Sequence, residues 1–212
     1  MTPQVQKNLT PEEALELLQA GNERFLKNQP FDRHLPSEIK ETASGQYPFA
    51  IVLSCIDSRV PTEVLFDQGI GDLFNARIAG NFVNKDILGS MEFACAVAGS
   101  KLIVVMGHTS CGAVKGACDH VELGNLTDML KNLEPAVEQT PADPDEDRSS
   151  ANEDFVNRVA QTNVELTLER ILKESEVLRY LFEKGEIGLV GAMYDVASGK
   201  VTFGPLQWKR PA

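Results

Sequence analysis

A succession of short apolar runs, each separated from the next by a longer segment, most constrains the fold of this chain. The runs span residues 49–54, 73–79, 101–107 and 187–196. A run that is apolar throughout is typical of a strand buried on both faces of a parallel sheet. Strands that alternate with helices predict such a sheet, with helices packed on both faces. We therefore expect an α/β fold with a mostly parallel central β-sheet flanked by helices. A turn at 197–200 before a last strand at 201–203 predicts a C-terminal β-hairpin.

The N-terminal region predicts a helical arm. Thr10 is followed by a proline and, three positions on, by Glu13, which is the pattern of a capping box at a helix start. The helix carries a stripe of apolar residues, formed by Ala14, Leu15, Leu18, Phe25 and Leu26. Such a stripe indicates that the helix lies on another surface. The polar segment 28–46 contains two prolines and is expected to be an extended connector. We expect residues 1–45 to form this arm and residues 46–212 to form one α/β domain.

The remaining helices are expected between the strands and after them. Their predicted positions are 61–66, 86–98, from about 112, from about 127, 153–172 and 175–183. The acidic, proline-containing segment 140–150 is expected to be a solvated loop.

The charge balance argues against nucleic acid and membrane partners. The 212 residues include 20 Lys and Arg against 31 Asp and Glu, a formal net charge of −11. Phosphates and anionic lipid surfaces are bound by clustered basic side chains, which this composition disfavours. No apolar run approaches the ~18 residues of a membrane span, and the first residues do not have the pattern of a signal peptide. We therefore expect a cytoplasmic protein whose four cysteines are thiols or metal ligands.

Two cysteines and a histidine follow predicted strands at one edge of the sheet. Cys55 comes directly after the run 49–54, and His108 and Cys111 follow the run 101–107. The carboxyl ends of parallel strands meet at the same edge, so these side chains can face a single ion. Thiolates with an imidazole suit Zn²⁺, and three protein ligands leave a fourth position open, as in catalytic zinc sites. The sequence therefore predicts a zinc site at this edge.

Asp57 and Arg59 lie close to Cys55 in the chain. Most such pairs are surface ion pairs of little consequence. Their position beside the predicted metal favours a functional pair instead.

The other cysteines and histidines are interpreted as structural. Cys95 lies in an apolar helical segment and is expected in the core. Cys118 and His120 form an alternative ligand pair, but the sequence offers them no third partner. His34 lies in the polar connector and is expected on the surface.

Two motifs in this order resemble the β-class carbonic anhydrases: CIDSR at 55–59 and GHTSCG at 107–112. The resemblance continues through FDQGIGDLFNARIAGN, LGSMEFA and GAMYD, and it covers most of residues 46–195. It implies an enzyme that interconverts CO₂ and bicarbonate by means of a zinc-bound hydroxide. It also implies a homodimer, alone or paired with a second dimer, in which the N-terminal arm packs across the partner subunit.

The resemblance also implies roles for individual residues. One zinc ion per chain is held by Cys55, His108 and Cys111. Asp57 and Arg59 become the catalytic pair, in which Asp57 orients the nucleophile and Arg59 holds Asp57 in place. The substrate pocket maps onto Gln46, Phe74, Ala79, Phe93 and Gly112. Of these residues, Phe74 and Phe93 are expected from the adjacent subunit.

Other functions stay open on the sequence alone. The same scaffold suits a hydrolase of a CO₂ analogue, such as carbonyl sulfide or carbon disulfide. A non-catalytic bicarbonate sensor and a thiol redox protein are further alternatives. A zinc nucleobase deaminase is disfavoured because its Glu after a ligand histidine and its Pro-Cys-x-x-Cys run are absent. Asp57 could also close the zinc site as a fourth ligand, although restraint by Arg59 favours the open state.

Overall fold

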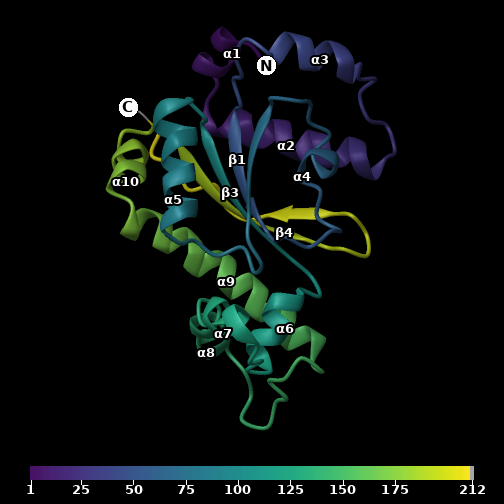
Figure 1. The fold of residues 1–212 in the computed structure, drawn as a ribbon, viewed down its shortest axis with the longest axis vertical. Coiled ribbons are helices and arrows are strands. Elements are labelled where there is room, and N and C mark those ends of the chain that lie inside the picture. The colour runs from purple at the N-terminus through teal and green to yellow at the C-terminus, as the bar shows by residue number, and fades with distance from the viewer. Residues whose placement is uncertain (211–212) are drawn as a thin grey trace.

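The computed structural model describes residues 1–210 and contains a five-stranded sheet with the order β2-β1-β3-β4-β5 (Figure 1). The strands are β1 (Ala50–Ser54), β2 (Leu73–Arg77), β3 (Leu102–His108), β4 (Gly188–Tyr194) and β5 (Val201–Phe203). The first four strands are parallel, and β5 pairs antiparallel with β4. The predicted α/β fold with its C-terminal hairpin is confirmed.

The helices lie before, between and after these strands. They are α1 (Pro3–Asn8), α2 (Pro11–Leu26), α3 (Leu35–Thr42), α4 (Thr62–Leu65), α5 (Lys85–Glu92), the π-helical turn η1 (Phe93–Val97), α6 (Gly112–Cys118), α7 (Gly124–Leu130), α8 (Glu134–Gln139), α9 (Glu153–Glu174) and α10 (Glu176–Glu183). Helical structure is present at every predicted position, although the predicted helix 86–98 is divided into α5 and η1, and α1, α3 and α8 add to the predicted set. Within residues 1–210 no helix combines the length and the apolarity that crossing a bilayer requires.

Helix α2 covers one face of the sheet. It begins as predicted, because the Thr10 hydroxyl accepts a hydrogen bond from the Glu13 amide and the Glu13 carboxylate accepts one from the Thr10 amide. Ala14, Leu15 and Leu18 are buried against side chains of β1, β3 and β4. The first part of the apolar stripe of α2 is thus covered within its own chain, whereas Leu26 at its end is 44% exposed. The division of the chain at residue 45 stays a prediction.

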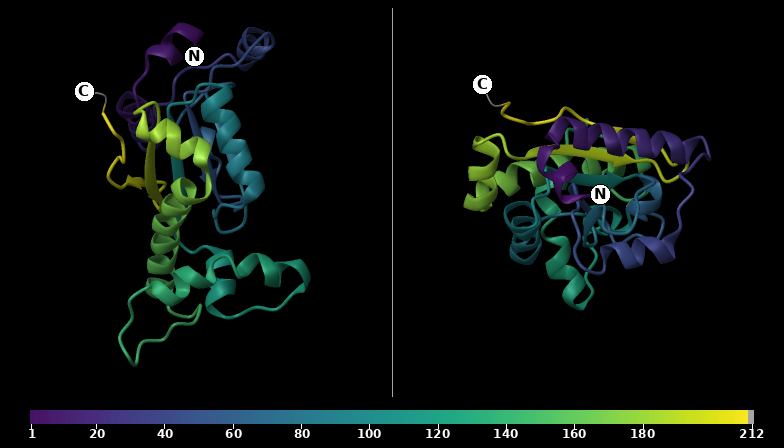
Figure 2. Two further views of the ribbon diagram at one scale, coloured as in Figure 1. Left: turned by 90° about the vertical axis from the view of Figure 1, so that its left-hand side faces the viewer. Right: turned by 90° about the horizontal axis from the view of Figure 1, so that it is seen from above.

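The opposite face of the sheet is covered by α5, η1, α9 and α10, and Figures 1 and 2 show α5 on the other side of the strands from α2. Met91, Cys95, Leu168 and Leu178 are among the buried side chains of this layer. Two apolar layers therefore enclose the parallel strands, which is why their sequences lack polar alternation.

A helical lobe lies beyond the carboxyl ends of the strands, in the lower part of Figure 1. It consists of α6, α7, α8 and the first half of α9, packed around side chains such as Val114, Leu133 and Phe155. Cys55 and Cys111 belong to the same cluster of buried residues. The lobe therefore closes over the sheet edge where the sequence predicts the metal site. The acidic segment 140–150 forms the loop between α8 and α9, as predicted.

Three local predictions were wrong. The connector 28–46 is not extended throughout, because it contains α3, whose Leu35 and Ile39 are exposed and so gave no sign of a buried stripe. Residues 86–98 do not form one α-helix, since α5 gives way to a π-helical turn at Phe93. His108 lies within β3, where it pairs with Tyr194, and does not follow the strand.

The close approach of α2 to the turn after α4 gives a test of the fold. A Cβ atom at Gly21 of α2 would lie 1.8 Å from the carbonyl oxygen of Phe66, whereas one at Gly89 of α5 would meet nothing within 4 Å. We expect Gly21→Ala to destabilise the protein by ~1–3 kcal/mol, the usual effect of overpacking. Gly89→Ala should instead stabilise it by ~0.5–1 kcal/mol, because alanine favours a helix interior. Thermal and urea unfolding followed by circular dichroism measures both, and equal effects would contradict this packing.

Candidate metal centre

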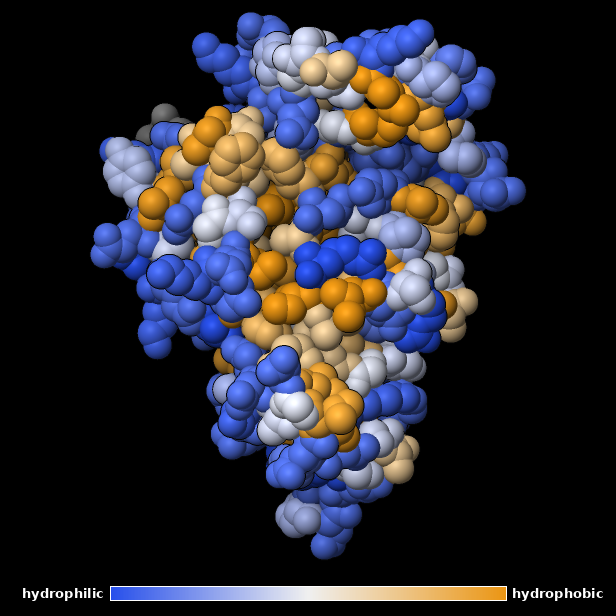
Figure 3. Space-filling model, in the orientation of Figure 1, coloured by the Kyte–Doolittle hydropathy of each residue, from blue (hydrophilic) through white to orange (hydrophobic). Residues whose placement is uncertain are grey.

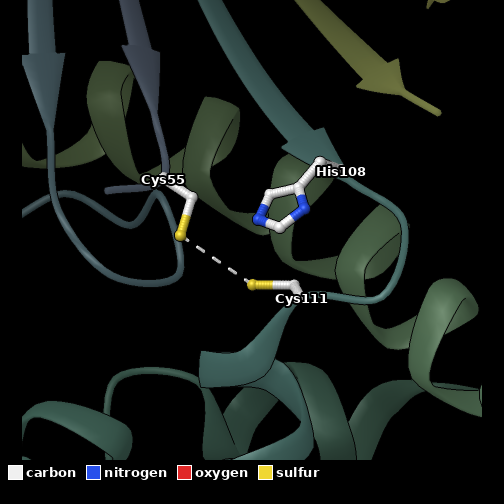
Figure 4. A group of neighbouring side chains, drawn as sticks. All are labelled: Cys55, His108 and Cys111. Atoms are coloured by element: carbon white, nitrogen blue, oxygen red, sulfur yellow. Dashed lines mark hydrogen bonds between the residues drawn. The ribbon is translucent and has the colours of Figure 1, made fainter. Parts of the chain in front are cut away.

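Three buried side chains from separate elements converge at the carboxyl edge of the sheet (Figure 4). Cys55 is the first residue after β1, His108 is the last residue of β3, and Cys111 is the N-cap residue of α6. The potential ligand atoms of these residues all lie within 4.8 Å of one another. The structure thus brings together the three residues that the sequence predicted as ligands, in an arrangement that could hold a metal ion.

The orientation of His108 fits metal binding. Its Nδ1 lies 2.9 Å from the Thr109 carbonyl oxygen, and because a carbonyl only accepts, Nδ1 carries the proton. Nε2 is then free to coordinate, since the other ring nitrogen holds the tautomer and the ring orientation. The side chain is 0% exposed, and no group within residues 1–210 forms a hydrogen bond with Nε2. A buried polar atom without a partner costs about 1–3 kcal/mol, which a bound metal would relieve.

The two thiols have a spacing and a chemistry that fit zinc. Cys55 Sγ and Cys111 Sγ are 4.0 Å apart. Two sulfurs bound to one tetrahedral zinc at ~2.3 Å would be about 3.8 Å apart. The hydrogen bond between the two sulfurs lowers the pKa of Cys55 and raises the pKa of Cys111, so Cys55 is the thiol that ionises first. The backbone amide of Gly80 also donates to Cys55 Sγ, at 3.4 Å. Two sulfurs and one imidazole are a donor set that zinc accepts, so the residues present fit this ion.

Asp57 and Arg59 form a rigid pair at the rim of this cluster. Arg59 Nε lies 2.9 Å from Asp57 Oδ1 and Arg59 Nη2 lies 2.7 Å from Asp57 Oδ2, so the contact is bidentate. The backbone amide of Arg59 donates to Oδ1 as well. These hydrogen bonds hold the pKa of the Asp57 carboxyl well below its usual range. Asp57 Oδ2 is 3.9 Å from His108 Nε2, which places the carboxylate next to the open side of the cluster.

Arg77 is a contributor that the sequence analysis did not single out. It lies at the end of β2, and its guanidinium donates to the carbonyl oxygens of Cys55 and Asp57 at 2.9 and 2.6 Å. Arg77 therefore holds the backbone that carries both side chains. Arg77 lies beside the end of β1 because β1 and β2 pair in parallel, with Ser54 opposite Arg77. In the sequence, the only sign of this role was that Arg77 stands near the end of a predicted strand.

The five residues of the predicted substrate pocket divide into two groups. Ala79 precedes Gly80, whose amide contacts Cys55, and Gly112 follows Cys111 directly, so both lie beside the cluster. Gln46 precedes β1 and therefore lies near the amino ends of the parallel strands, whereas Cys55 lies at their carboxyl ends. It lines a hollow of about 240 Å³ together with residues such as Gly71.

The two phenylalanines are also away from the cluster of their own chain. Phe74 and Phe93 pack edge to face, with ring centroids 6.0 Å apart. They line a separate hollow of about 570 Å³ on the face that α5 covers. A single chain therefore does not assemble the whole predicted pocket.

The other cysteines and histidines lie outside the cluster. Burial raises the pKa of Cys95 to about 12 and that of Cys118 to about 11, in agreement with thiols packed in the core. His34 precedes α3 and contacts Ser37, and His120 is exposed after α6. Within residues 1–210, Cys55, His108 and Cys111 form the only group of three or more such side chains close enough to share a metal.

Comparisons with known proteins agree in one family. A family model described as carbonic anhydrase matches residues 50–201. Carbonic anhydrase 2 of Mycobacterium tuberculosis is 33% identical over 207 residues, which cover 92% of this chain and 94% of that protein. The carbonic anhydrase of Mycolicibacterium smegmatis is 35% identical over 202 residues, with 92% and 93% covered.

Solved structures agree as well. A tetrameric β-carbonic anhydrase of Sordaria macrospora is 27% identical, with a TM-score of 0.71 over 81% of this chain and 88% of that chain. The β-carbonic anhydrase CafA of Aspergillus fumigatus is 31% identical, with a TM-score of 0.70 over 80% of this chain and 81% of that chain.

The convergence of the three side chains generates a prediction of metal content. We expect about one zinc ion per chain in the parent protein, as for a single three-ligand site. Cys55→Ser, His108→Ala and Cys111→Ser should each reduce the zinc content to near zero, because each removes a donor. Elemental analysis after dialysis measures this content. Cys118→Ser is the matched control, since Cys118 is also a buried thiol but does not belong to the group of Cys55, His108 and Cys111. This variant should retain the metal. Full zinc occupancy in all three ligand variants would mean that the ion binds elsewhere.

Proposed function

The chain belongs to the carbonic anhydrase family, with β-class enzymes among its structural relatives, and on this premise we propose that it catalyses the reversible hydration of CO₂ to bicarbonate and a proton. We further propose that one zinc ion is held by Cys55, His108 and Cys111. The observation that carries the proposal is the buried cluster of two thiols and one unpartnered imidazole nitrogen at the sheet edge. Three protein donors leave one tetrahedral position open, as catalytic zinc requires.

The chemistry divides between the ion and the side chains around it. Zinc in this position would supply Lewis acidity and bring the pKa of a coordinated water down to roughly 7. Asp57 supplies a fixed hydrogen-bond acceptor on the open side of the cluster, 3.9 Å from His108 Nε2. Because Arg59 holds the pKa of its carboxyl low, Asp57 stays ionised near neutral pH and can accept a hydrogen bond from the nucleophile. It thereby orients the nucleophile toward CO₂.

Arg59 has a second role in this proposal. Asp57 is a potential metal ligand, and a carboxylate in the open position would exclude the nucleophile. The bidentate contact with Arg59, together with the hydrogen bond from the Arg59 amide, occupies both carboxylate oxygens. Arg59 Nη2 is also within 3.3 Å of the Ser110 carbonyl oxygen, which fixes the guanidinium to the turn between His108 and Cys111. The pair is therefore restrained in the open arrangement.

We propose that a second copy of the chain completes the substrate pocket. Ala79 and Gly112 come from the chain that holds the metal, and Gln46, Phe74 and Phe93 come from the partner. Figure 3 shows apolar patches on the face that α5 covers, and Phe93 and Val97 of η1 are 52% and 73% exposed. Exposed apolar side chains of this kind are typical of an interface between subunits. The Sordaria macrospora relative is described as tetrameric, which supports an oligomer, either a homodimer or a dimer of dimers.

The N-terminal arm is proposed to help hold this dimer together. Ala14, Leu15 and Leu18 of α2 pack on the sheet of their own chain, so a contact across the dimer would use other side chains of the arm. Val5 of α1 and Leu35 and Ile39 of α3 are exposed and offer such a contact.

Two alternatives remain distinguishable by experiment. Hydrolysis of carbonyl sulfide or carbon disulfide would use the same residues, and substrate competition assays separate it from CO₂ hydration. A thiol redox protein is suggested by the 4.0 Å separation of the Cys55 and Cys111 sulfurs. The unpartnered Nε2 of His108 favours the metal site, and stoichiometric zinc would exclude the redox role. We also propose a cytoplasmic location, where the thiols of Cys55 and Cys111 would stay reduced and able to bind a metal.

The restraint of Asp57 by Arg59 gives a test of the mechanism. Arg59→Ala should lower CO₂ hydration, measured by stopped flow, by at least about 10²-fold, because the freed carboxylate moves into the open coordination position. Zinc content should stay normal, and the visible spectrum of the cobalt-substituted protein should change as the ligand set changes. Arg158→Ala is the matched control, since Arg158 is a similarly exposed arginine paired with Glu146, away from the cluster. An active Arg59→Ala enzyme with an unchanged cobalt spectrum would reduce the pair to an ordinary ion pair.

Pocket assembly across the dimer gives a second test, by mixing inactive subunits. A Cys55→Ser chain lacks a ligand but offers intact phenylalanines, and a Phe74→Ala/Phe93→Ala chain has the opposite defect. In a 1:1 mixture half of the dimers are mixed, and each has one complete site, so activity should recover to about a quarter of the parent value. Mixing Cys55→Ser with Cys111→Ser should restore nothing, because both defects lie in the cluster of one chain. No recovery in the first mixture would place the phenylalanines outside the partner's site.

A further inference from the structure

Helix α9 passes very close to the strand that carries His108. A Cβ atom at Gly107, the residue before His108, would lie 2.9 Å from Val164 Cγ2 and 3.4 Å from the Ala160 carbonyl oxygen, both in α9. Glycine at this position therefore permits the helix to lie directly against the end of β3. Two asparagines of α9, Asn157 and Asn163, reach from this helix to the two turns that surround the cluster.

Asn163 supports the turn that contacts Cys55. Its Nδ2 donates a hydrogen bond of 2.8 Å to the carbonyl oxygen of Gly80, and the residue is 3% exposed. The amide of the same Gly80 points at Cys55 Sγ. Gly80 has a φ of +81° and is packed under Leu133, so the turn adopts a conformation that only glycine enters readily. Asn163 thus holds, through the carbonyl of Gly80, the same residue whose N–H group contacts the sulfur.

Asn157 supports the turn between the other two ligands. Its Oδ1 accepts a hydrogen bond of 3.0 Å from the amide of Ser110. Ser110 lies between His108 and Cys111 and has a φ of +53°, a left-handed conformation that costs a non-glycine residue energy. The hydrogen bond that Ser110 donates to Asn157 offsets part of this cost and holds the turn that sets the distance between His108 and Cys111.

We propose that Asn157 and Asn163 are positioning residues of the metal centre, acting through opposite halves of their amide groups. Asn163 acts as a donor, because its partner is a carbonyl oxygen, and Asn157 acts as an acceptor, because its partner is an N–H group. Neither belongs to the ligand set, and both come from one helix. The inference deepens the proposed function, on which it rests for the identity of the ion. Mutation of residues that support the ligands through hydrogen bonds, without binding the metal themselves, typically changes metal affinity by 10–100-fold.

The opposite roles allow a sharp test with aspartate, which has the shape of asparagine but only acceptor atoms when ionised. Asn157→Asp retains the acceptor and should bind zinc within about threefold of the parent, whereas Asn157→Leu should weaken binding ~10–100-fold. Asn163→Asp and Asn163→Leu both lose the donor and should both weaken zinc binding by that factor. Competition with a chelator of known affinity measures these dissociation constants.

Spectroscopy of the cobalt-substituted proteins supplies a readout that simple loss of stability does not move. An N–H group that points at a thiolate stabilises its lone pairs. When the Gly80 amide is no longer held at Cys55, the thiolate-to-cobalt charge-transfer band should shift to longer wavelength. We expect this shift in both Asn163 variants and not in Asn157→Asp.

Asn22 offers a matched control on the far side of the sheet. It is 4% exposed, and its Nδ2 donates to the carbonyl oxygens of Leu65 and Gly199 while its Oδ1 accepts from the Val201 amide. Asn22→Leu should lower thermal stability and leave both the zinc affinity and the cobalt spectrum unchanged.

The outcomes separate this inference from the proposed function. The inference is overturned if all the α9 variants bind zinc within threefold of the parent, if Asn157→Asp is as weak as Asn157→Leu, or if Asn22→Leu weakens binding equally. A parent that binds zinc but does not hydrate CO₂ overturns the proposed function alone. A parent without stoichiometric zinc overturns both.

Discussion

The site depends on the parallel pairing of β1 with β3. Ser54, the last residue of β1, lies opposite Met106, so Cys55 and His108 leave neighbouring strands at nearly the same height. A shift of the register by one residue would turn His108 to the other face of the sheet and separate the two donors. The buried layers on both faces make such a shift costly, because every apolar side chain of the strand would move with it. The hydrophobic core thus fixes the geometry of a polar site that contributes little to that core.

A second level of organisation holds the loops beyond the strands. Arg77 fixes the backbone of Cys55 and Asp57 through carbonyl oxygens, and Arg59 fixes the Asp57 carboxylate. Arg77 comes from the neighbouring strand β2, whereas Arg59 comes from the same turn as Asp57. Contacts that do not involve the ion therefore hold the backbone and the carboxylate around the cluster. Preorganisation of this kind reduces the free energy that binding must supply.

The sequence predicted the order of strands and helices and the meeting of Cys55, His108 and Cys111, because both follow from apolar runs and from where the runs end. It failed where the deciding contact lies elsewhere in the chain. The helix α3 has exposed Leu35 and Ile39, so its periodicity had no buried face to mark it. His108 is part of β3 because Tyr194 of β4 pairs with it, and that register is not visible in residues 101–107. Gln46 precedes β1 and Cys55 follows it, so the two residues lie at opposite ends of the strand. The assignment of Gln46 to the pocket rested on family motifs, which do not show at which end of a strand a residue lies.

The length of α9 has a consequence for motion. Its first half packs in the lobe through Phe155, Val156 and Val159, and its second half packs on the sheet through Val164, Leu168 and Ile171. One continuous helix in two apolar clusters makes a hinge between lobe and sheet expensive, because bending there would break both. Backbone amides of α9 should accordingly exchange with solvent only through large-scale unfolding. A centre held between the lobe and the sheet in this way has no hinge with which to open around a large molecule, which suits the small substrate that we propose.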